Sequence, residues 1–101
     1  MPQDFQYVYG DVRRICTASR ADRPWGPALE IEIRDEGGSL MNNVIFGCHP
    51  EQADYEHWRA KSTDELIDAV VERLSSGAYE ETLRQARQSG FKLILNFSNL
   101  S

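Results

Sequence analysis

The chain has 101 residues, which is enough for one hydrophobic core and too few for two, so a single domain spanning residues 1–101 is expected. Hydrophobic residues make up 41% of the chain and charged residues 27%, a composition typical of globular domains and unlike that of disordered chains. The formal net charge of −5 argues against direct nucleic-acid binding, because affinity for phosphate backbones depends on Lys and Arg, but it suits a basic protein partner.

The first third of the chain is rich in β-branched and aromatic residues, which favour strands. Residues 6–18 are predicted to form one strand, or two short strands separated at Gly10-Asp11. Residues 20–27 contain Asp, Gly and two Pro and are expected to form a loop. Residues 28–34 give the clearest strand pattern, because large aliphatic residues alternate strictly with charged ones. One face of this strand should be buried and the other exposed to water.

Two turn signals flank the next predicted strand. Asp35-Glu36-Gly37-Gly38 supplies residues that tolerate the positive φ of a tight turn. Residues 43–48 then form a strand, which is expected to pair antiparallel with the strand before the turn. His49-Pro50-Glu51 has Pro in a first helical turn and an acid where the helix dipole favours it. These residues predict a short helix that ends at about residue 59.

The most secure helix is predicted to begin after Ser62. Ser62 and Glu65 have the spacing of a capping box, and an apolar stripe at helical spacing follows them. This helix should end near residues 75–77. A further helix over residues 78–89 should end at Gly90, which suits the left-handed conformation of a C-terminal cap.

The chain should close with a strand over residues 91–97, where apolar residues alternate. Ile94 lies on the second face of this strand and indicates a position inside the sheet. Because strands come early and helices late, the predicted fold class is α+β. We expect a mainly antiparallel sheet of about four strands with two to three helices on one face.

Expectations for the location of the protein and for its thiols rest on sequence patterns that the chain lacks. No stretch contains the ~20 apolar residues that span a membrane, and residues 1–6 do not resemble a signal peptide. A soluble cytoplasmic protein is therefore expected. Cys16 and Cys48 are too few for a disulfide framework and lack CxxC spacing, so buried free thiols are favoured over a bridge.

Few residues suggest catalysis. The chain lacks the glycine-rich phosphate-binding motifs and the nucleophile elbow of common enzyme classes, and no acid stands in an apolar setting. Cys48, His49 and His57 are residue types that bind zinc or form an activated nucleophile, with Cys16 as a fourth candidate ligand. Packing and solvation explain these residues more simply. No catalytic residue, metal or cofactor is predicted, and a small Cys/His metal-binding protein or enzyme is the alternative from another class.

Charge is distributed unevenly along the chain. Residues 51–81 contain nine acids and three bases, whereas residues 82–101 contain three bases and no acid. Tyr55 and Trp58 lie one helical turn apart within the acidic segment, as candidate aromatic anchors for a basic partner. Inward packing of both rings is the alternative. The predicted partner-binding residues are Glu51, Asp54, Tyr55, Glu56, Trp58, Asp64, Asp68 and Glu72.

Residues 28–98 resemble small immunity proteins of bacterial polymorphic-toxin and contact-dependent inhibition systems. The likeness consists of the strands, an acidic amphipathic helix, the segment Gly77-x-Tyr79-Glu80-Glu81, a second helix, Gly90-Phe91 and a final strand. The resemblance implies a cytoplasmic antidote that binds a cognate toxin domain, often a nuclease, and blocks its active site. The acidic balance of this chain would complement the basic groove of a nuclease.

The leading hypothesis is a stoichiometric protein inhibitor, in particular an immunity protein against a cognate toxin. An anti-CRISPR or other phage-encoded inhibitor is its nearest rival, because such proteins are equally small, acidic and free of catalytic motifs. A structural or regulatory subunit that dimerises through a strand edge is a third class. The expected partner is a basic protein, and direct binding to nucleic acid or to a membrane is not expected.

Overall fold

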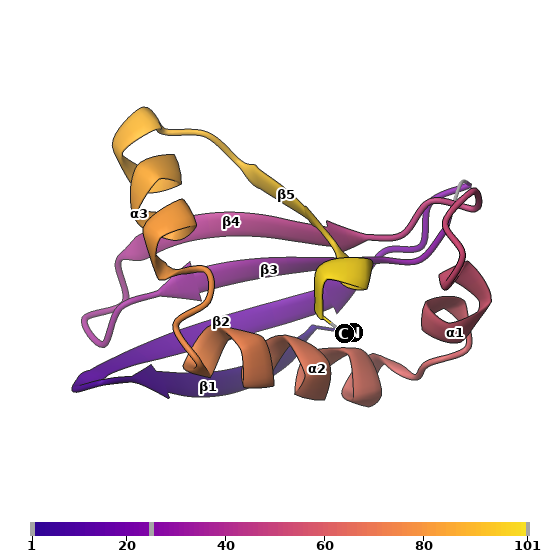
Figure 1. Ribbon diagram of the computed structural model, residues 1–101. Helices are drawn as coiled ribbons and strands as arrows, with labels where there is room; N and C mark the ends of the chain where they lie inside the picture. Colours follow the sequence, from indigo (N-terminus) through magenta and orange to yellow (C-terminus); the bar gives the residue numbers. More distant parts are fainter. Residues whose placement is uncertain (1, 25, 101) are drawn as a thin grey trace.

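The computed structural model describes residues 2–24 and 26–100 and shows one sheet with helices on one face (Figure 1). Strands β1 to β4 are antiparallel and lie in chain order, and β5 pairs parallel with β4 at the edge. The predicted α+β class is confirmed, with five strands instead of about four. The strands are β1 (Gln3–Tyr9), β2 (Val12–Arg20), β3 (Ala28–Arg34), β4 (Leu40–Gly47) and β5 (Leu93–Asn96).

The N-terminal segment is a hairpin, so the second of the two alternatives for residues 6–18 is correct. The chain reverses at Gly10, whose φ of 59° is unfavourable for other residues, and Tyr9 pairs with Val12. Strand β2 continues to Arg20, and the following loop contains a single bridge between Arg23 and Gly26. The predicted loop therefore starts one residue later than expected.

The second hairpin joins β3 and β4. Strand β3 has the predicted bounds, and its alternating aliphatic side chains Leu29, Ile31 and Ile33 are buried. In the turn, the Asp35 carboxylate accepts a hydrogen bond of 3.0 Å from the Ser39 N–H. Strand β4 begins at Leu40, three residues earlier than predicted, because Leu40 and Asn42 pair with Arg34 and Ile33 of β3.

Helix α1 (Tyr55–Arg59) is shorter than predicted. Residues 49–54 form turns instead of helix, with the Gln52 N–H donating to the His49 carbonyl and the Gln52 side chain accepting from the His49 N–H. The predicted helix start at His49 is therefore wrong. The side chain of Gln52 satisfies the backbone locally, and this favours a turn over the continuation of a helix.

Helix α2 (Thr63–Ser75) begins with the predicted capping box. The Ser62 hydroxyl accepts from the Glu65 N–H at 3.2 Å, and the Glu65 carboxylate accepts from the Ser62 N–H at 2.9 Å. Its inward stripe is buried against the sheet and η1, and α2 lies mainly over β1 (Figure 1). The buried members of the stripe are Leu66, Ile67, Val70 and Leu74.

Helix α3 (Glu80–Ser89) ends as predicted at Gly90, whose φ is 73°. The Phe91 N–H then donates to the Ala86 carbonyl at 3.1 Å, and the Gly90 N–H donates to the Arg87 carbonyl at 3.3 Å. These two bonds form a Schellman motif, which fixes the exit of the chain from the helix.

The C-terminal strand differs most from expectation. Strand β5 covers Leu93–Asn96, and a short 3₁₀ helix, η1 (Phe97–Leu100), follows it. Because β5 has a neighbour on one side only, the predicted position of Ile94 inside the sheet is wrong, and its side chain is 73% exposed. Phe97 lies in the core at the start of η1 instead of ending the strand.

The core fills the layer between the helices and one face of the sheet. Phe97 stacks between Phe46 and Trp58, with ring centroids 5.9 Å and 5.3 Å apart. Cys16 and Cys48 are buried and free, as predicted. The other face of the sheet carries polar and charged side chains such as Thr17, Glu32 and Asn43 together with Ile15 and Ile45. No helix covers this face in the described part of the chain (Figure 1). Among the described residues, no helix has the length and hydropathy of a membrane span.

Candidate functional site

Three of the predicted partner-binding residues form one row on α2. Asp64, Asp68 and Glu72 are spaced by four residues, so they lie on the same face of the helix, opposite its buried stripe. All three side chains are exposed. None of them takes part in an ion pair or side-chain hydrogen bond within the described residues. We refer to these three carboxylates as the acidic row.

The acidic row does not help the isolated protein to fold. Like charges four residues apart destabilise a helix by about 0.2–0.5 kcal/mol per pair. The helix dipole favours Asp64 in the first turn and disfavours Glu72 near the C-terminal end. Neither packing nor local pairing requires a charge at these three positions, and the row is therefore a candidate for recognition of a basic surface.

Two further predicted residues extend the acidic surface around the start of α2. Glu51 is exposed in the turn before α1, and Glu56 is exposed on α1, which lies beside the N-terminal end of α2 (Figure 1). Glu56 is partly neutralised, because its carboxylate lies 3.3 Å from the Arg59 guanidinium, three residues along the helix. Such an exposed pair is weak and leaves both side chains free to exchange partners.

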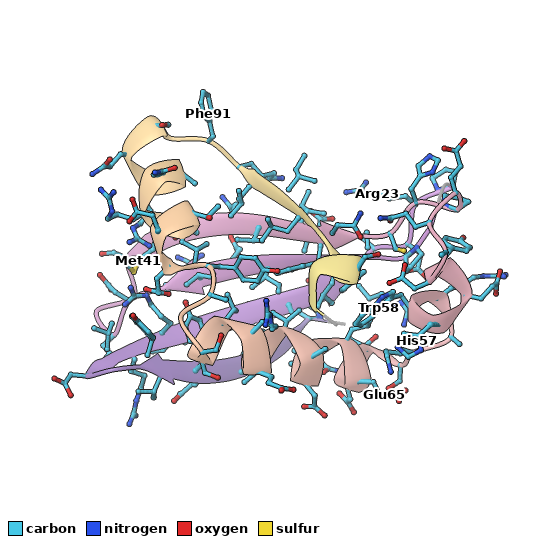
Figure 2. All side chains as sticks on the ribbon, in the orientation of Figure 1. Arg23, Met41, His57, Trp58, Glu65 and Phe91 are labelled. Carbon is cyan, nitrogen blue, oxygen red and sulfur yellow. The ribbon has the colours of Figure 1, made fainter. Side chains whose placement is uncertain are left out.

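The prediction that Trp58 is a surface anchor is wrong. Its side chain is 3% exposed, and its ring stacks on Phe97 at an interplanar angle of 16°. The indole Nε1–H donates to the Asp54 carboxylate at 2.9 Å, and the Lys61 ammonium lies 5.7 Å from the ring centroid. In Figure 2, Trp58 lies on the side of α1 that faces η1. The alternative of inward packing is the correct one for Trp58.

Asp54 and Tyr55 also contribute contacts within the fold. Asp54 accepts a second hydrogen bond, of 2.7 Å, from the Ser98 hydroxyl, so it links α1 to η1. The hydrogen bonds from Ser98 and Trp58 hold the pKa of the Asp54 carboxyl below its usual range. Tyr55 is half-buried against the core, and a Cβ added to Gly26 would lie 2.8 Å from its ring. The structure thus separates these residues from the acidic row.

A buried polar cluster beneath α3 was not predicted. Arg14 on β2 lies 3.5 Å from the Glu80 carboxylate, and both side chains are largely buried. Asn42 on β4 donates to the Leu83 carbonyl at 3.1 Å and accepts from Arg87 at 2.9 Å. These contacts attach α3 to the sheet. The sequence does carry a signal for them, because Arg14 and Asn42 interrupt the apolar alternation of their strands.

The residues proposed for metal or nucleophile chemistry differ in exposure, because the two cysteines are buried and the two histidines are exposed. Among the described residues, no group of three or more His, Cys, Asp or Glu side chains has the arrangement of a metal site. Burial raises the pKa of the Cys48 thiol, which opposes formation of the thiolate. His49 accepts a hydrogen bond from the Glu51 N–H through Nδ1, and His57 is exposed.

The acidic row, together with Glu51 and Glu56, is the candidate functional site. The acidic row places unpaired charge on α2, a capped helix whose opposite face is anchored in the core. No family model matches the chain, and no curated protein and no solved structure matches it significantly.

Proposed function

We propose that this protein is a stoichiometric inhibitor of the immunity-protein kind, which neutralises a cognate toxin by binding a basic surface of it through the acidic row. The observation that carries the proposal is the row itself, three exposed carboxylates with no ion-pair partner in the described chain. Binding to Lys and Arg side chains relieves the repulsion within the row, so the partner supplies the stabilisation that the isolated protein lacks.

The geometry of α2 supports recognition of an extended basic surface. From Asp64 to Glu72 the row spans about 12 Å along the helix axis at 1.5 Å per residue. The capping box and the buried stripe hold the helix in place, so little freedom is lost when the carboxylates engage a partner. A nuclease groove, which binds phosphates through Lys and Arg, has the complementary charge.

The test separates binding from folding. In the row variant, Asp64→Asn, Asp68→Asn and Glu72→Gln remove three charges without changing shape. We expect its free energy of unfolding to equal or exceed that of the wild type, by about 0.2–0.5 kcal/mol for each relieved pair. Its affinity for the partner should fall at least about tenfold, with a weaker dependence on salt.

A matched control removes the same number of charges elsewhere. Glu30→Gln, Glu32→Gln and Glu36→Gln change side chains on β3 and in the turn after it, on the sheet side of the molecule. Glu30 and Glu32 form partly exposed ion pairs with Arg23 and Arg34, so the stability of this variant is measured as well. This control variant should retain the affinity of the wild type. Equal loss of affinity in both variants would attribute binding to net charge and sink the assignment of the row.

The partner to test is the product of the gene next to this one. A toxin domain encoded there should be inhibited completely at a ratio of one to one by the wild type, and incompletely at that ratio by the row variant. Phage genes on both sides would instead favour a phage-encoded inhibitor. Inactivation of the toxin by far less than one equivalent would overturn stoichiometric inhibition and indicate catalysis.

A further inference from the structure

Strand β5 leaves one side of the sheet open. It pairs with β4 only, and in Figure 1 no other element runs along its outer side. In the described part of the chain, no backbone hydrogen bond joins this outer side to another segment. An edge strand of this kind presents unpaired N–H and C=O groups, which can pair with another extended chain.

Two large apolar side chains stand at this edge in water. Phe91 and Ile94 are each 73% exposed, and no other large hydrophobic side chain in the described residues is more exposed. Figure 2 shows Phe91 pointing away from the body of the molecule. The residue after the glycine of a Schellman motif commonly packs back on its own helix, but most of the Phe91 side chain remains uncovered. The motif therefore holds Phe91 in place without burying it.

The surface around Phe91 is basic although the protein is acidic. A groove of about 280 Å³ lies between β4 and α3, and a second of about 400 Å³ lies between α3 and β5. Both grooves include Phe91 and Lys92, and the first also includes Arg87. Neither is lined by an acid, whereas the chain as a whole has 16 acids and 11 bases. Lys92 is exposed and has no ion-pair partner in the described chain.

We propose that the β5 edge, defined by Phe91, Lys92 and Ile94, binds an extended acidic segment of a partner protein, which adds a strand beside β5. The backbone of the segment pairs with the free edge, its apolar side chains cover Phe91 and Ile94, and its carboxylates meet Lys92. A second copy of this chain is a poorer occupant, because each copy has a net charge of −5 and two copies repel each other. A nucleic acid is also a poorer occupant, because it has no peptide groups to pair with the strand edge.

The proposed strand site is separate from the acidic row. Helix α2 lies over β1, at one edge of the sheet, and β5 forms the opposite edge (Figure 1). One surface suits a basic partner and the other an acidic segment, so this inference goes beyond the proposed inhibitor function. The row variant should keep the full affinity of the β5 edge for its ligand, and failure of either proposal leaves the other standing.

The experiment uses a blocked synthetic peptide of alternating Val and Glu as the probe. Backbone amide shifts of the labelled full chain should move in β5, in β4 and at Phe91 when the peptide is added. The double variant Phe91→Ser with Lys92→Glu should lose at least about tenfold in affinity. Both side chains are exposed, so circular dichroism and the melting temperature should match the wild type.

A matched control changes the other edge of the sheet. Val8 is 49% exposed on β1 and lies opposite the exposed Arg13 on β2, so Val8→Ser with Arg13→Glu is the same chemical change at the opposite edge. This variant should bind the peptide as the wild type does. The inference is overturned if the peptide does not bind, if both double variants lose affinity equally, or if a peptide of alternating Val and Lys binds as well.

A second copy of the chain or a nucleic acid at the β5 edge would each give a different experimental result. Sedimentation that shows a dimer in the wild type and a monomer in the Phe91→Ser, Lys92→Glu variant would replace the proposed segment with a second copy of the chain. Stronger shifts of the same amides with a single-stranded oligonucleotide than with the acidic peptide would replace it with a nucleic acid. Either result would overturn binding of an acidic protein segment.

Discussion

Trp58 joins α1 to η1 through one side chain. It belongs to α1, stacks on Phe97 of η1 and donates a hydrogen bond to Asp54. We predict that Trp58→Ala lowers the free energy of unfolding by about 3–5 kcal/mol, the usual cost of removing a buried aromatic side chain. Urea unfolding followed by circular dichroism measures this change.

The neighbouring His57 provides the control for Trp58. It is exposed, and its ring meets Trp58 edge-on with centroids 5.1 Å apart. His57→Ala should change the free energy of unfolding by less than about 1 kcal/mol. If Trp58→Ala left stability unchanged and weakened partner binding, the role of this residue as an anchor would be restored.

Arg14 and Glu80 form an ion pair in which each charge depends on the other for compensation. Their side chains are 10% and 18% exposed, so removal of the base leaves an acid with few other partners. We predict that Arg14→Leu destabilises the protein by about 3–5 kcal/mol, and that Arg14→Leu with Glu80→Leu recovers much of the loss. A double-mutant cycle on unfolding free energies measures the coupling.

The exposed pair of Glu56 and Arg59 is the comparison for that cycle. Its side chains are 79% and 62% exposed. The same cycle should return about 0–1 kcal/mol at this pair, because water screens the charges. Equal coupling energies at the two pairs would contradict the assignment of a special role to the buried one.

At the scale of elements, two glycines end α2 and α3 with similar geometry and different surroundings. Gly77 and Gly90 have φ values of 83° and 73°. A Cβ added to Gly77 would lie 2.2 Å from the ring of Tyr9, whereas a Cβ at Gly90 would have nothing within 4 Å. Gly90→Ala should therefore cost about 1–2 kcal/mol, from the backbone alone.

Gly77→Ala should cost more than Gly90→Ala by about 1–3 kcal/mol, because Tyr9 must also move. Thermal or urea unfolding of the two variants compares them directly. The excess should shrink when Tyr9→Ala is present as well, since the contact is then absent. Equal costs for the two glycine variants would show that the contact with Tyr9 is unimportant.

The capping box determines where α2 begins. We predict that Ser62→Ala lowers the free energy of unfolding by about 0.5–2 kcal/mol, because the Glu65 N–H loses its acceptor. Ser89→Ala is the matched control, as Ser89 is exposed at the end of α3 and should change stability by less than about 0.5 kcal/mol. Urea unfolding compares the two variants. Equal losses of stability would show that the cap is not the cause of the effect of Ser62→Ala.

At the scale of the whole molecule, the core contains groups that ionise in alkali. Burial raises the pKa of the Cys16 thiol from 9.0 to about 12, and the pKa values of Tyr7 and Cys48 are also raised, mainly by burial. A group with a raised folded-state pKa stabilises the fold fully below its unfolded pKa, and this contribution is lost as the pH rises toward the folded value.

We therefore predict that the free energy of unfolding falls as the pH rises from 9 toward 12. Cys16→Ala should reduce the slope of this fall, because the unfolded chain then releases one proton fewer. Urea unfolding at a series of pH values under reducing conditions measures both slopes. Identical slopes for the wild type and Cys16→Ala would show that the thiol does not ionise with unfolding in this range.

The two edges of the sheet differ in charge, so acidic and basic side chains gather on opposite sides of the molecule. The acidic row lies on α2 over β1, and the basic grooves border α3 and β5. The uneven charge along the chain was visible in the sequence, but its separation across the sheet depends on the order of the strands. Segments far apart in the sequence reach opposite edges because β5 crosses over to pair with β4.

Local patterns in the sequence were sufficient for the elements whose causes are local. The alternation in residues 28–34, the capping box at Ser62 and the glycine cap at Gly90 each involve contacts among nearby residues. Asp64, Asp68 and Glu72 were predicted as partner-binding residues, and helical spacing alone puts them on one exposed face of α2.

Burial and strand order depended on contacts between distant segments, which periodicity does not encode. Trp58 and Phe97 are buried because α1 and η1 meet over the sheet, whereas Phe91 and Ile94 are exposed because β5 is an edge strand. The sequence by itself thus determined the local elements and the acidic face of α2. Only the tertiary structure decided which apolar side chains form the core and which remain in water, because that choice depends on which elements pack together.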